Sequence, residues 1–141
     1  MANITRYGER TADGAASFRC AACGELAGVV RATAGGAAAT GPPLGTTTSD
    51  QDGFIVSDFI GIAWLAAGRA VLDAVRALID EGSIDPLALR DIHWELAPFY
   101  CPDCQLNYCR NHWNTHVIFD KDLYDCTKGT CPNGHEHTVD D

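Results

Sequence analysis

Four short pairs of cysteine and histidine residues constrain what this chain can fold into more than any other feature of its sequence. In each pair, two or three residues separate the two members. The pairs are Cys20 with Cys23, Cys101 with Cys104, Cys109 with His112, and Cys131 with His135. A tight turn, or the first turn of a helix, brings two such side chains to within about 4 Å of a common point, as a tetrahedral zinc site requires. Four such pairs therefore predict structural zinc sites.

The short link between the second and third pairs indicates how the pairs combine. Four residues lie between Cys104 and Cys109, so a hairpin that folded both pairs onto one ion would be very short. Sharing the pairs between two ions is easier. We therefore predict two structural Zn²⁺ ions with interleaved ligand sets. One set is Cys20, Cys23, Cys109 and His112, and the other is Cys101, Cys104, Cys131 and His135.

The seventh cysteine, Cys126, leaves alternatives open. It could replace His135 as the partner of Cys131, it could be spare, or it could be a nucleophile. We prefer His135 as the ligand because GTCPNGH contains two glycines and can turn tightly. A nucleophilic thiol needs a nearby cation or base to lower its pKa. Lys128 and His137 are the local candidates for that role, although His137 is otherwise expected to be solvated.

Composition and charge argue against two classes of binding partner. Ten basic residues against nineteen acidic residues give a net charge of -9, which disfavours binding to nucleic acid or to an anionic membrane. Residues 1–17 are small and polar, so we expect a frayed lead-in without a signal peptide. The chain is therefore expected to be cytoplasmic, with reduced cysteines, and the odd number of cysteines favours metal over a disulfide framework.

The hydrophobic pattern predicts one long helix. From Asp58 to Glu81 apolar residues recur at helical spacing, and Gly82 suits the left-handed residue just past the helix end. A short second helix is predicted from Pro86, with Asp85 as its N-terminal cap. Residues 92–101 alternate apolar and polar side chains at first, which is typical of a half-buried strand that leads into the second cysteine pair.

These elements predict a single domain over residues 1–141. Residues 18–30 and 92–141 would form the zinc module, and residues 53–91 would form a helical insertion. Residues 31–52 are poor in large apolar side chains, so we expect a flexible loop there. The predicted fold class is α+β, a small zinc-stabilised domain with one long inserted helix.

The ligand pattern resembles the cross-brace, treble-clef zinc modules, and RING fingers above all. Three features carry the resemblance: the interleaved pairs, the closeness of the second and third pairs, and the entry of Tyr108 and Cys109 into a short helix. ZZ and MYND fingers are also similar. The resemblance covers residues 18–24 and 99–137. It implies a RING-like protein-interaction module, an E3-type adaptor that recruits a conjugating enzyme loaded with a ubiquitin-like modifier and forms no covalent intermediate.

The resemblance also implies a docking face, beside Cys20 and Cys23 and together with Trp113. A composition rich in Ala and poor in Lys points to a bacterial ubiquitin-like conjugation system. Two other functions stay open. One is a non-catalytic structural or binding module whose partner surface is the helix from Asp58 to Glu81. The other is an enzyme that uses Cys126 or an open zinc site.

Overall fold

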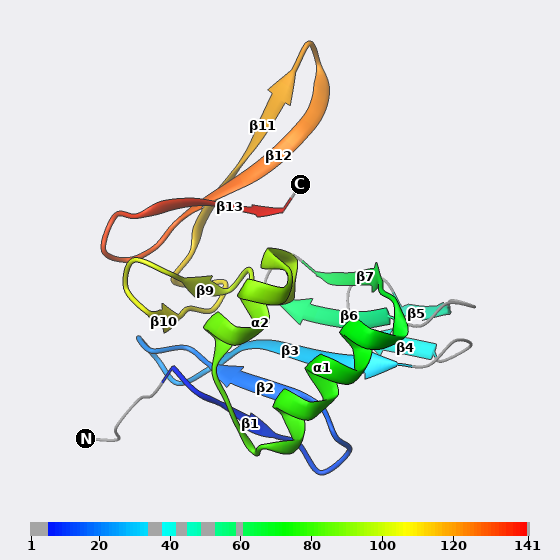
Figure 1. The fold of residues 1–141 in the computed structure, drawn as a ribbon. Coiled ribbons are helices and arrows are strands. Elements are labelled where there is room, and N and C mark those ends of the chain that lie inside the picture. The colour runs from blue at the N-terminus through cyan, green and yellow to red at the C-terminus, as the bar shows by residue number, and fades with distance from the viewer. Residues whose placement is uncertain (1–5, 34–37, 42–44, 49–52, 59–60, 141) are drawn as a thin grey trace.

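A six-stranded antiparallel sheet forms the body of the protein (Figure 1). The computed structural model describes residues 6–33, 38–41, 45–48, 53–58 and 61–140. The strand order in the sheet is β7-β6-β3-β2-β1-β8. Its strands are β1 (Gly8–Arg10), β2 (Ala16–Arg19), β3 (Leu26–Thr33), β6 (Gly53–Asp58), β7 (Ile62–Ala66) and β8 (Ser83–Ile84). Sequential strands are therefore neighbours in this sheet, except for β8, which pairs with β1 after the first helix.

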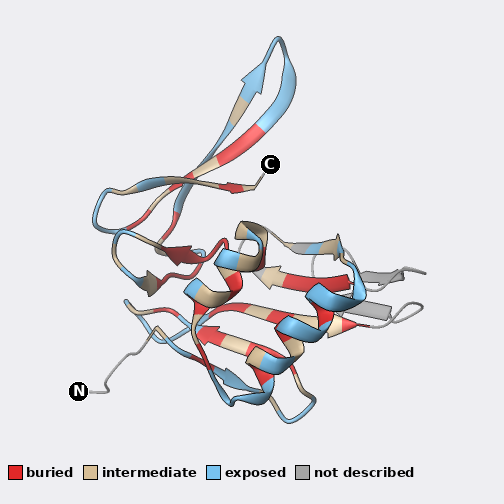
Figure 2. Ribbon diagram, viewed as in Figure 1, coloured by how far each residue is buried: buried red, intermediate tan, exposed pale blue. Residues whose placement is uncertain are grey.

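Two helices cover one face of this sheet (Figure 1). They are α1 (Arg69–Asp80) and α2 (Pro86–Ile92). Helix α1 buries Leu72, Val75 and Ile79, whose spacing of three and four residues places them on one helical face. Its other residues are exposed or half-buried, as Figure 2 shows along the ribbon. The core therefore lies between the helices and the sheet.

The predicted helix signals at residues 82–86 are confirmed. Gly82 follows α1 with a φ of 83°, a left-handed conformation that glycine adopts without steric cost. The carboxylate of Asp85 accepts a hydrogen bond of 3.0 Å from the backbone N–H of Leu87, and Pro86 is the first residue of α2. Local capping chemistry therefore fixes the start of α2.

Two phenylalanine rings extend the core toward the cysteine-rich region. The ring centroids of Phe18 and Phe99 lie 4.8 Å apart, and both side chains are fully buried. Gly28 on β3 allows this packing, because a Cβ atom there would lie 2.3 Å from the Phe99 ring. Phe99 is followed by β9 (Tyr100–Cys101), which pairs with β10 (Leu106–Asn107). Packing in the body thus fixes the position of the second cysteine pair.

A second, three-stranded sheet lies in the C-terminal part of the chain. It consists of β11 (Asn114–Asp120), β12 (Leu123–Thr130) and β13 (Glu136–Asp140), in that order. The β11–β12 hairpin projects away from the body (Figure 1). Its two turn residues, Lys121 and Asp122, have φ values of 51° and 67°, as tight hairpin turns require. The remaining strands, β4 (Ala38–Gly41) and β5 (Gly45–Thr48), pair with each other.

The predicted α+β fold with one long inserted helix is wrong. Strands dominate the described residues, and the two α-helices are short. The helix predicted from Asp58 begins only at Arg69, because residues 62–66 form β7 and pair along β6. A helix through that segment would also contain Gly61 and Gly68, each of which costs about 1 kcal/mol inside a helix. Pairing with a neighbouring strand therefore overrides the helical period.

Other local predictions also need correction. Residues 94–96 form a 3-10 helix instead of a strand, and the ring of His93 accepts a hydrogen bond of 3.1 Å from the backbone N–H of Glu95 at its start. The lead-in over residues 1–17 contains β1 and the start of β2. Within the loop predicted for residues 31–52, β3 ends and β4 and β5 form, while the other residues of that segment lie outside the described part.

Candidate metal centres

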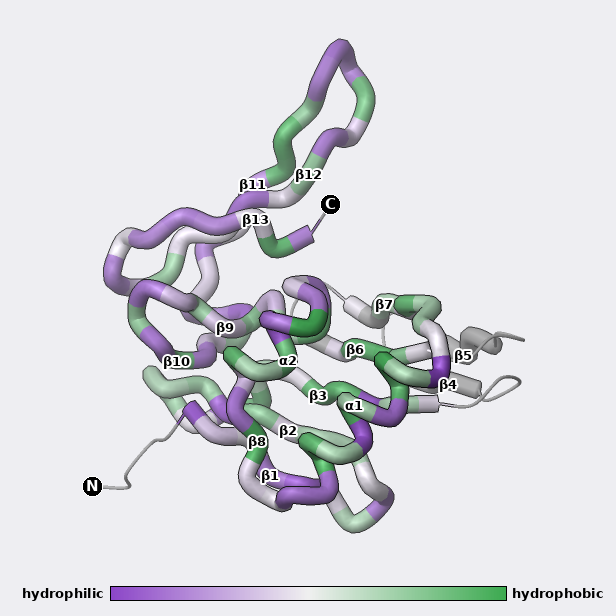
Figure 3. Tube along the Cα trace, viewed as in Figure 1, coloured by the Kyte–Doolittle hydropathy of each residue, from purple (hydrophilic) through white to green (hydrophobic). Residues whose placement is uncertain are grey.

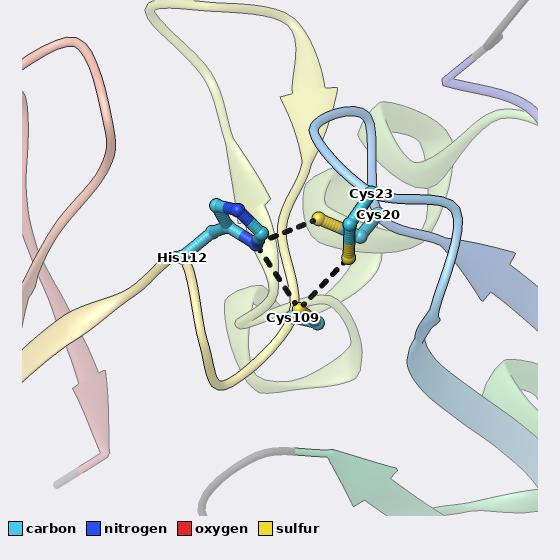
Figure 4. A group of neighbouring side chains, drawn as sticks. All are labelled: Cys20, Cys23, Cys109 and His112. Carbon is cyan, nitrogen blue, oxygen red and sulfur yellow. Dashed lines mark hydrogen bonds between the residues drawn. The ribbon is translucent and has the colours of Figure 1, made fainter.

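Cluster 1, which consists of Cys20, Cys23, Cys109 and His112, joins the body sheet to the C-terminal half (Figure 4). Cys20 directly follows β2 and Cys23 lies in the turn to β3, while Cys109 and His112 lie in the turn before β11. The Nδ1 atom of His112 lies 3.6 Å from the Cys20 sulfur and 3.4 Å from the Cys109 sulfur. The sulfurs of Cys23 and Cys109 are 3.6 Å apart.

Cluster 2, which consists of Cys101, Cys104, Cys131 and His135, joins two tight hairpins. Cys101 is the last residue of β9 and Cys104 lies in the turn to β10, while Cys131 and His135 lie in the β12–β13 connection. The Nδ1 atom of His135 lies 3.8 Å, 3.3 Å and 3.3 Å from the sulfurs of Cys101, Cys104 and Cys131, respectively. The sulfurs of Cys104 and Cys131 are 3.6 Å apart.

The two Cys-x-x-Cys turns have the same backbone form. In the first, the N–H of Gly24 donates to the carbonyl of Cys20 at 2.8 Å, and in the second, the N–H of Gln105 donates to the carbonyl of Cys101 at 2.8 Å. The residue after each pair is left-handed, with φ values of 78° at Gly24 and 57° at Gln105. Each turn thereby directs its two sulfurs toward the same point.

The ligand spacing fits a tetrahedral ion. Zinc bonds of about 2.3 Å to sulfur and about 2.05 Å to nitrogen, at the tetrahedral angle, place two sulfurs about 3.8 Å apart and a sulfur and a nitrogen about 3.6 Å apart. The corresponding distances in the two clusters run from 3.3 to 3.8 Å. A disulfide would need about 2.05 Å between sulfurs. Both clusters could therefore hold metal ions, and three sulfurs with one imidazole suit zinc.

Electrostatics in the clusters also favour a cation. Burial raises the pKa of Cys101 to about 12 and that of Cys109 to about 11. Burial opposes the thiolate of Cys104 as well, but hydrogen bonds from Asn133 and other neighbours outweigh it and lower the pKa to about 6. At Cys20, backbone hydrogen bonds likewise outweigh burial and lower the pKa. A divalent cation would favour the thiolate form at every position of a cluster.

His137 lies beside cluster 2, although the sequence predicted a solvated side chain. Its side chain is 19% exposed, and its ring packs edge-on against Trp113 with centroids 6.5 Å apart. The Nε2 atom lies 3.0 Å from the carboxylate of Asp103 and 3.6 Å from the sulfur of Cys101. A shared tetrahedral ion would hold this nitrogen and oxygen about 3.4 Å apart. The shorter distance is that of a hydrogen bond, so Nε2–H donates to Asp103 and lies next to the cluster 2 sulfur.

The structure brings the eight predicted residues together in the two predicted sets, and their role as metal ligands stays a prediction. Cys126 belongs to neither cluster, and His135 is the residue beside Cys131. The sequence prediction missed His137 as a neighbour of cluster 2. The available signal was its nearness in sequence to His135, which directly precedes β13 and lies two positions before His137.

The fold and the clusters define a strand-rich domain with two Cys3His groups that could bind metal, which is compatible with a zinc-finger-like module. The chain belongs to the family described as domain of unknown function DUF8328, whose model matches residues 9–141. That match includes both clusters. A comparison with curated proteins found no match, and a comparison with solved structures found none either. Within the described residues, neither helix has the length and apolar character that crossing a membrane would require.

Proposed function

We propose that the protein is a two-zinc module whose ions hold together a surface that binds another protein. One observation carries this proposal. Eight ligand atoms lie in two sets with tetrahedral spacing, and each set joins chain segments that are far apart in sequence. Cys23 and Cys109 are 86 positions apart, and Cys104 and Cys131 are 27 positions apart. Ions in both clusters would therefore act as long-range cross-links.

A structural role is favoured over catalysis by the number of ligands. Each cluster offers four protein ligands, which close a tetrahedral shell, whereas a catalytic zinc keeps one position for water or substrate. The thiol-enzyme alternative has weak support. Cys126 is 8% exposed, and the ammonium group of Lys128 donates to the hydroxyl of Thr138 at 2.8 Å. Cys126 is thus largely buried, and one of the two predicted activating groups, Lys128, has a hydroxyl partner of its own.

A narrower version of the proposal is that the partner is a conjugating enzyme loaded with a ubiquitin-like modifier. The interleaved order of the ligand pairs supports it. Two observations count against a RING-like docking face. Trp113 is 4% exposed and donates its indole N–H to the carbonyl of Phe99, so it belongs to the core. The turn of cluster 1 offers only Ala21 and Ala22 between its cysteines. We therefore favour the broader class of partner, and direct binding of purified conjugating enzymes tests the narrower one.

Metal content tests the proposed module. Native mass spectrometry of the full chain should show two zinc ions, because there are two four-ligand clusters. The variants Cys23→Ser and Cys104→Ser should each hold one ion. Cys126→Ser should still hold two, because Cys126 lies outside both clusters. A wild-type chain that folds and binds neither zinc nor another divalent metal would exclude a two-zinc module.

A further inference from the structure

The β11–β12 hairpin carries an unusual share of the exposed apolar surface. Eight large apolar side chains are exposed among the described residues, and four of them lie on this hairpin. They are Val117, Phe119, Leu123 and Tyr124, with exposures of 46%, 65%, 72% and 47%. Figure 2 shows that most of the projecting hairpin is exposed, and Figure 3 shows hydrophobic stretches on both of its legs below a hydrophilic tip. A concentration of this kind is typical of an interaction surface.

Three of these side chains form one preorganised face. Val117 and Phe119 are two residues apart on β11, so they point to the same side, and Tyr124 is the cross-strand partner of Phe119. The hydroxyl of Tyr124 donates to the carboxylate of Asp140 at 2.7 Å and lies 3.0 Å from the hydroxyl of Thr127. These hydrogen bonds hold the Tyr124 ring in place, so little side-chain freedom is lost when a partner binds.

The outer edge of β11 is open to a further strand. Within the described part of the chain, β11 pairs with β12 alone. Natural edge strands are usually blunted by Lys, Pro or a bulge. The sequence NTHVIFD of β11 contains neither Lys nor Pro, and the bulge in this hairpin places its extra residue, Asp125, on β12. The backbone of β11 can therefore form a regular ladder with another extended chain.

Charge distinguishes between two possible partners for the edge of β11, a different protein and a second copy of this chain. The tip carries Asp120, Asp122 and Asp125 with one basic residue, Lys121. The whole chain has a net charge of -9, so two copies repel each other at long range. A basic segment is attracted by both the tip and the whole molecule. The charge therefore favours a different protein with Lys or Arg residues over a second copy of this chain.

We propose that the edge of β11 binds an extended basic segment of a partner protein as an added strand. Alternate apolar side chains of that segment pack on Val117 and Phe119, and its Lys or Arg side chains face the acidic tip. This inference rests on the proposed function, since it names the class of partner that the module binds. The backbone ladder supplies affinity, and the apolar face and the acidic tip supply selectivity.

Peptide binding to the full, zinc-loaded chain tests the inference. The probe is a fluorescent eight-residue peptide of alternating Val and Lys, compared with the same peptide carrying Glu in place of Lys. A third peptide carries Pro at its centre, which removes a backbone donor. We expect binding of the Lys peptide, and binding weaker by about tenfold or more for the Glu and Pro peptides. Equal binding of the three peptides, or no binding of the Lys peptide, overturns the inference.

Matched variants locate the site. The double variant Val117→Thr, Phe119→Thr keeps β-forming residues and should weaken binding of the Lys peptide by about tenfold, because it removes apolar contact area. Val71→Thr on α1, where Val71 is 39% exposed, should leave binding unchanged. If the variant on β11 binds as well as the wild type, the hairpin is not the site. If instead sedimentation shows a wild-type dimer that the β11 variant abolishes, the occupant is a second copy. Zinc counts on the same samples show whether the two-zinc module is present. A sample that holds two zinc ions but does not bind the peptide counts against the inference on β11 and not against the proposed module.

Discussion

Loss of cluster 1 should destabilise the protein more than loss of cluster 2. The perturbations are Cys23→Ser and Cys104→Ser. Each removes the second cysteine of a Cys-x-x-Cys turn, and neither of these cysteines is among the fully buried residues. Each cluster contains three sulfurs and one Nδ1 atom, so the bond energies lost are similar in the two variants. The difference between them should therefore come from the length of chain that each ion closes.

The chain separations give the magnitude. Cluster 1 joins Cys23 to Cys109 across 86 positions, and cluster 2 joins Cys104 to Cys131 across 27 positions. In the loop-closure treatment of a cross-link, these separations correspond to about 4.6 and about 3.6 kcal/mol of stabilisation. The two loops share only residues 104–109, so the contributions are nearly independent. Cys23→Ser should thus cost about 1 kcal/mol more than Cys104→Ser, and either loss is large beside a total stability of about 5–15 kcal/mol.

Thermal unfolding of the two variants provides the assay. For a chain of this length, a difference of 1 kcal/mol corresponds to about 4 °C in Tm, with Cys23→Ser melting lower. Native mass spectrometry must show that each variant keeps one zinc, since only then does each report the loss of a single cross-link. A lower Tm for Cys104→Ser, with one zinc retained in both variants, would refute the argument from loop length.

Two further substitutions test the surroundings of the clusters. His137→Ala should lower the zinc affinity of cluster 2 by about 10–100-fold in a chelator competition, because it removes the N–H group beside the Cys101 sulfur. In the Co²⁺-loaded protein, His137→Ala should also shift the sulfur-to-metal band. His137→Gln should restore part of the affinity, and His116→Ala on β11 should leave it unchanged. Gly28→Ala should cost about 1–3 kcal/mol in thermal unfolding, because the added Cβ would overlap the Phe99 ring, and Phe99→Leu in the same chain should recover part of this loss.

The grouping of the clusters could be predicted because it depends on local geometry. A Cys-x-x-Cys turn fixes its own two sulfurs, and the short link from Cys104 to Cys109 prevents the neighbouring pairs from sharing one ion. The capping of α2 by Asp85 is local in the same way. In each case the residues that determine the structure lie within a few positions of one another, so spacing and residue type were sufficient.

The errors arose where a distant segment decides the structure. The sequence of residues 62–66 suits a helix, but these residues pair with residues 53–57 of β6. No pattern near residues 62–66 indicates that the edge of β6 is available for pairing with this segment. His137 was expected in solvent because its partners, Cys101 and Asp103, are more than thirty positions away. The β11–β12 hairpin is a different case. Its two turn residues, Lys121 and Asp122, stand between two runs rich in β-forming residues, and this pattern was available in the sequence.

The two clusters together explain how a small domain can hold a projecting hairpin in a fixed direction. Strand β11 begins two residues after His112 of cluster 1, and β12 ends immediately before Cys131 of cluster 2. Each leg of the hairpin therefore starts beside a different candidate metal site, and an ion there would also hold a Cys-x-x-Cys turn, after β2 in cluster 1 and after β9 in cluster 2. Between the legs, the Trp113 ring packs against Gly129, where a Cβ atom would lie 3.1 Å from the indole. One ion would leave the hairpin free to swing about a single point, whereas two ions would fix both its position and its direction. Binding of a partner segment to β11 should thus depend on both clusters, while the clusters should form whether or not β11 can bind that segment.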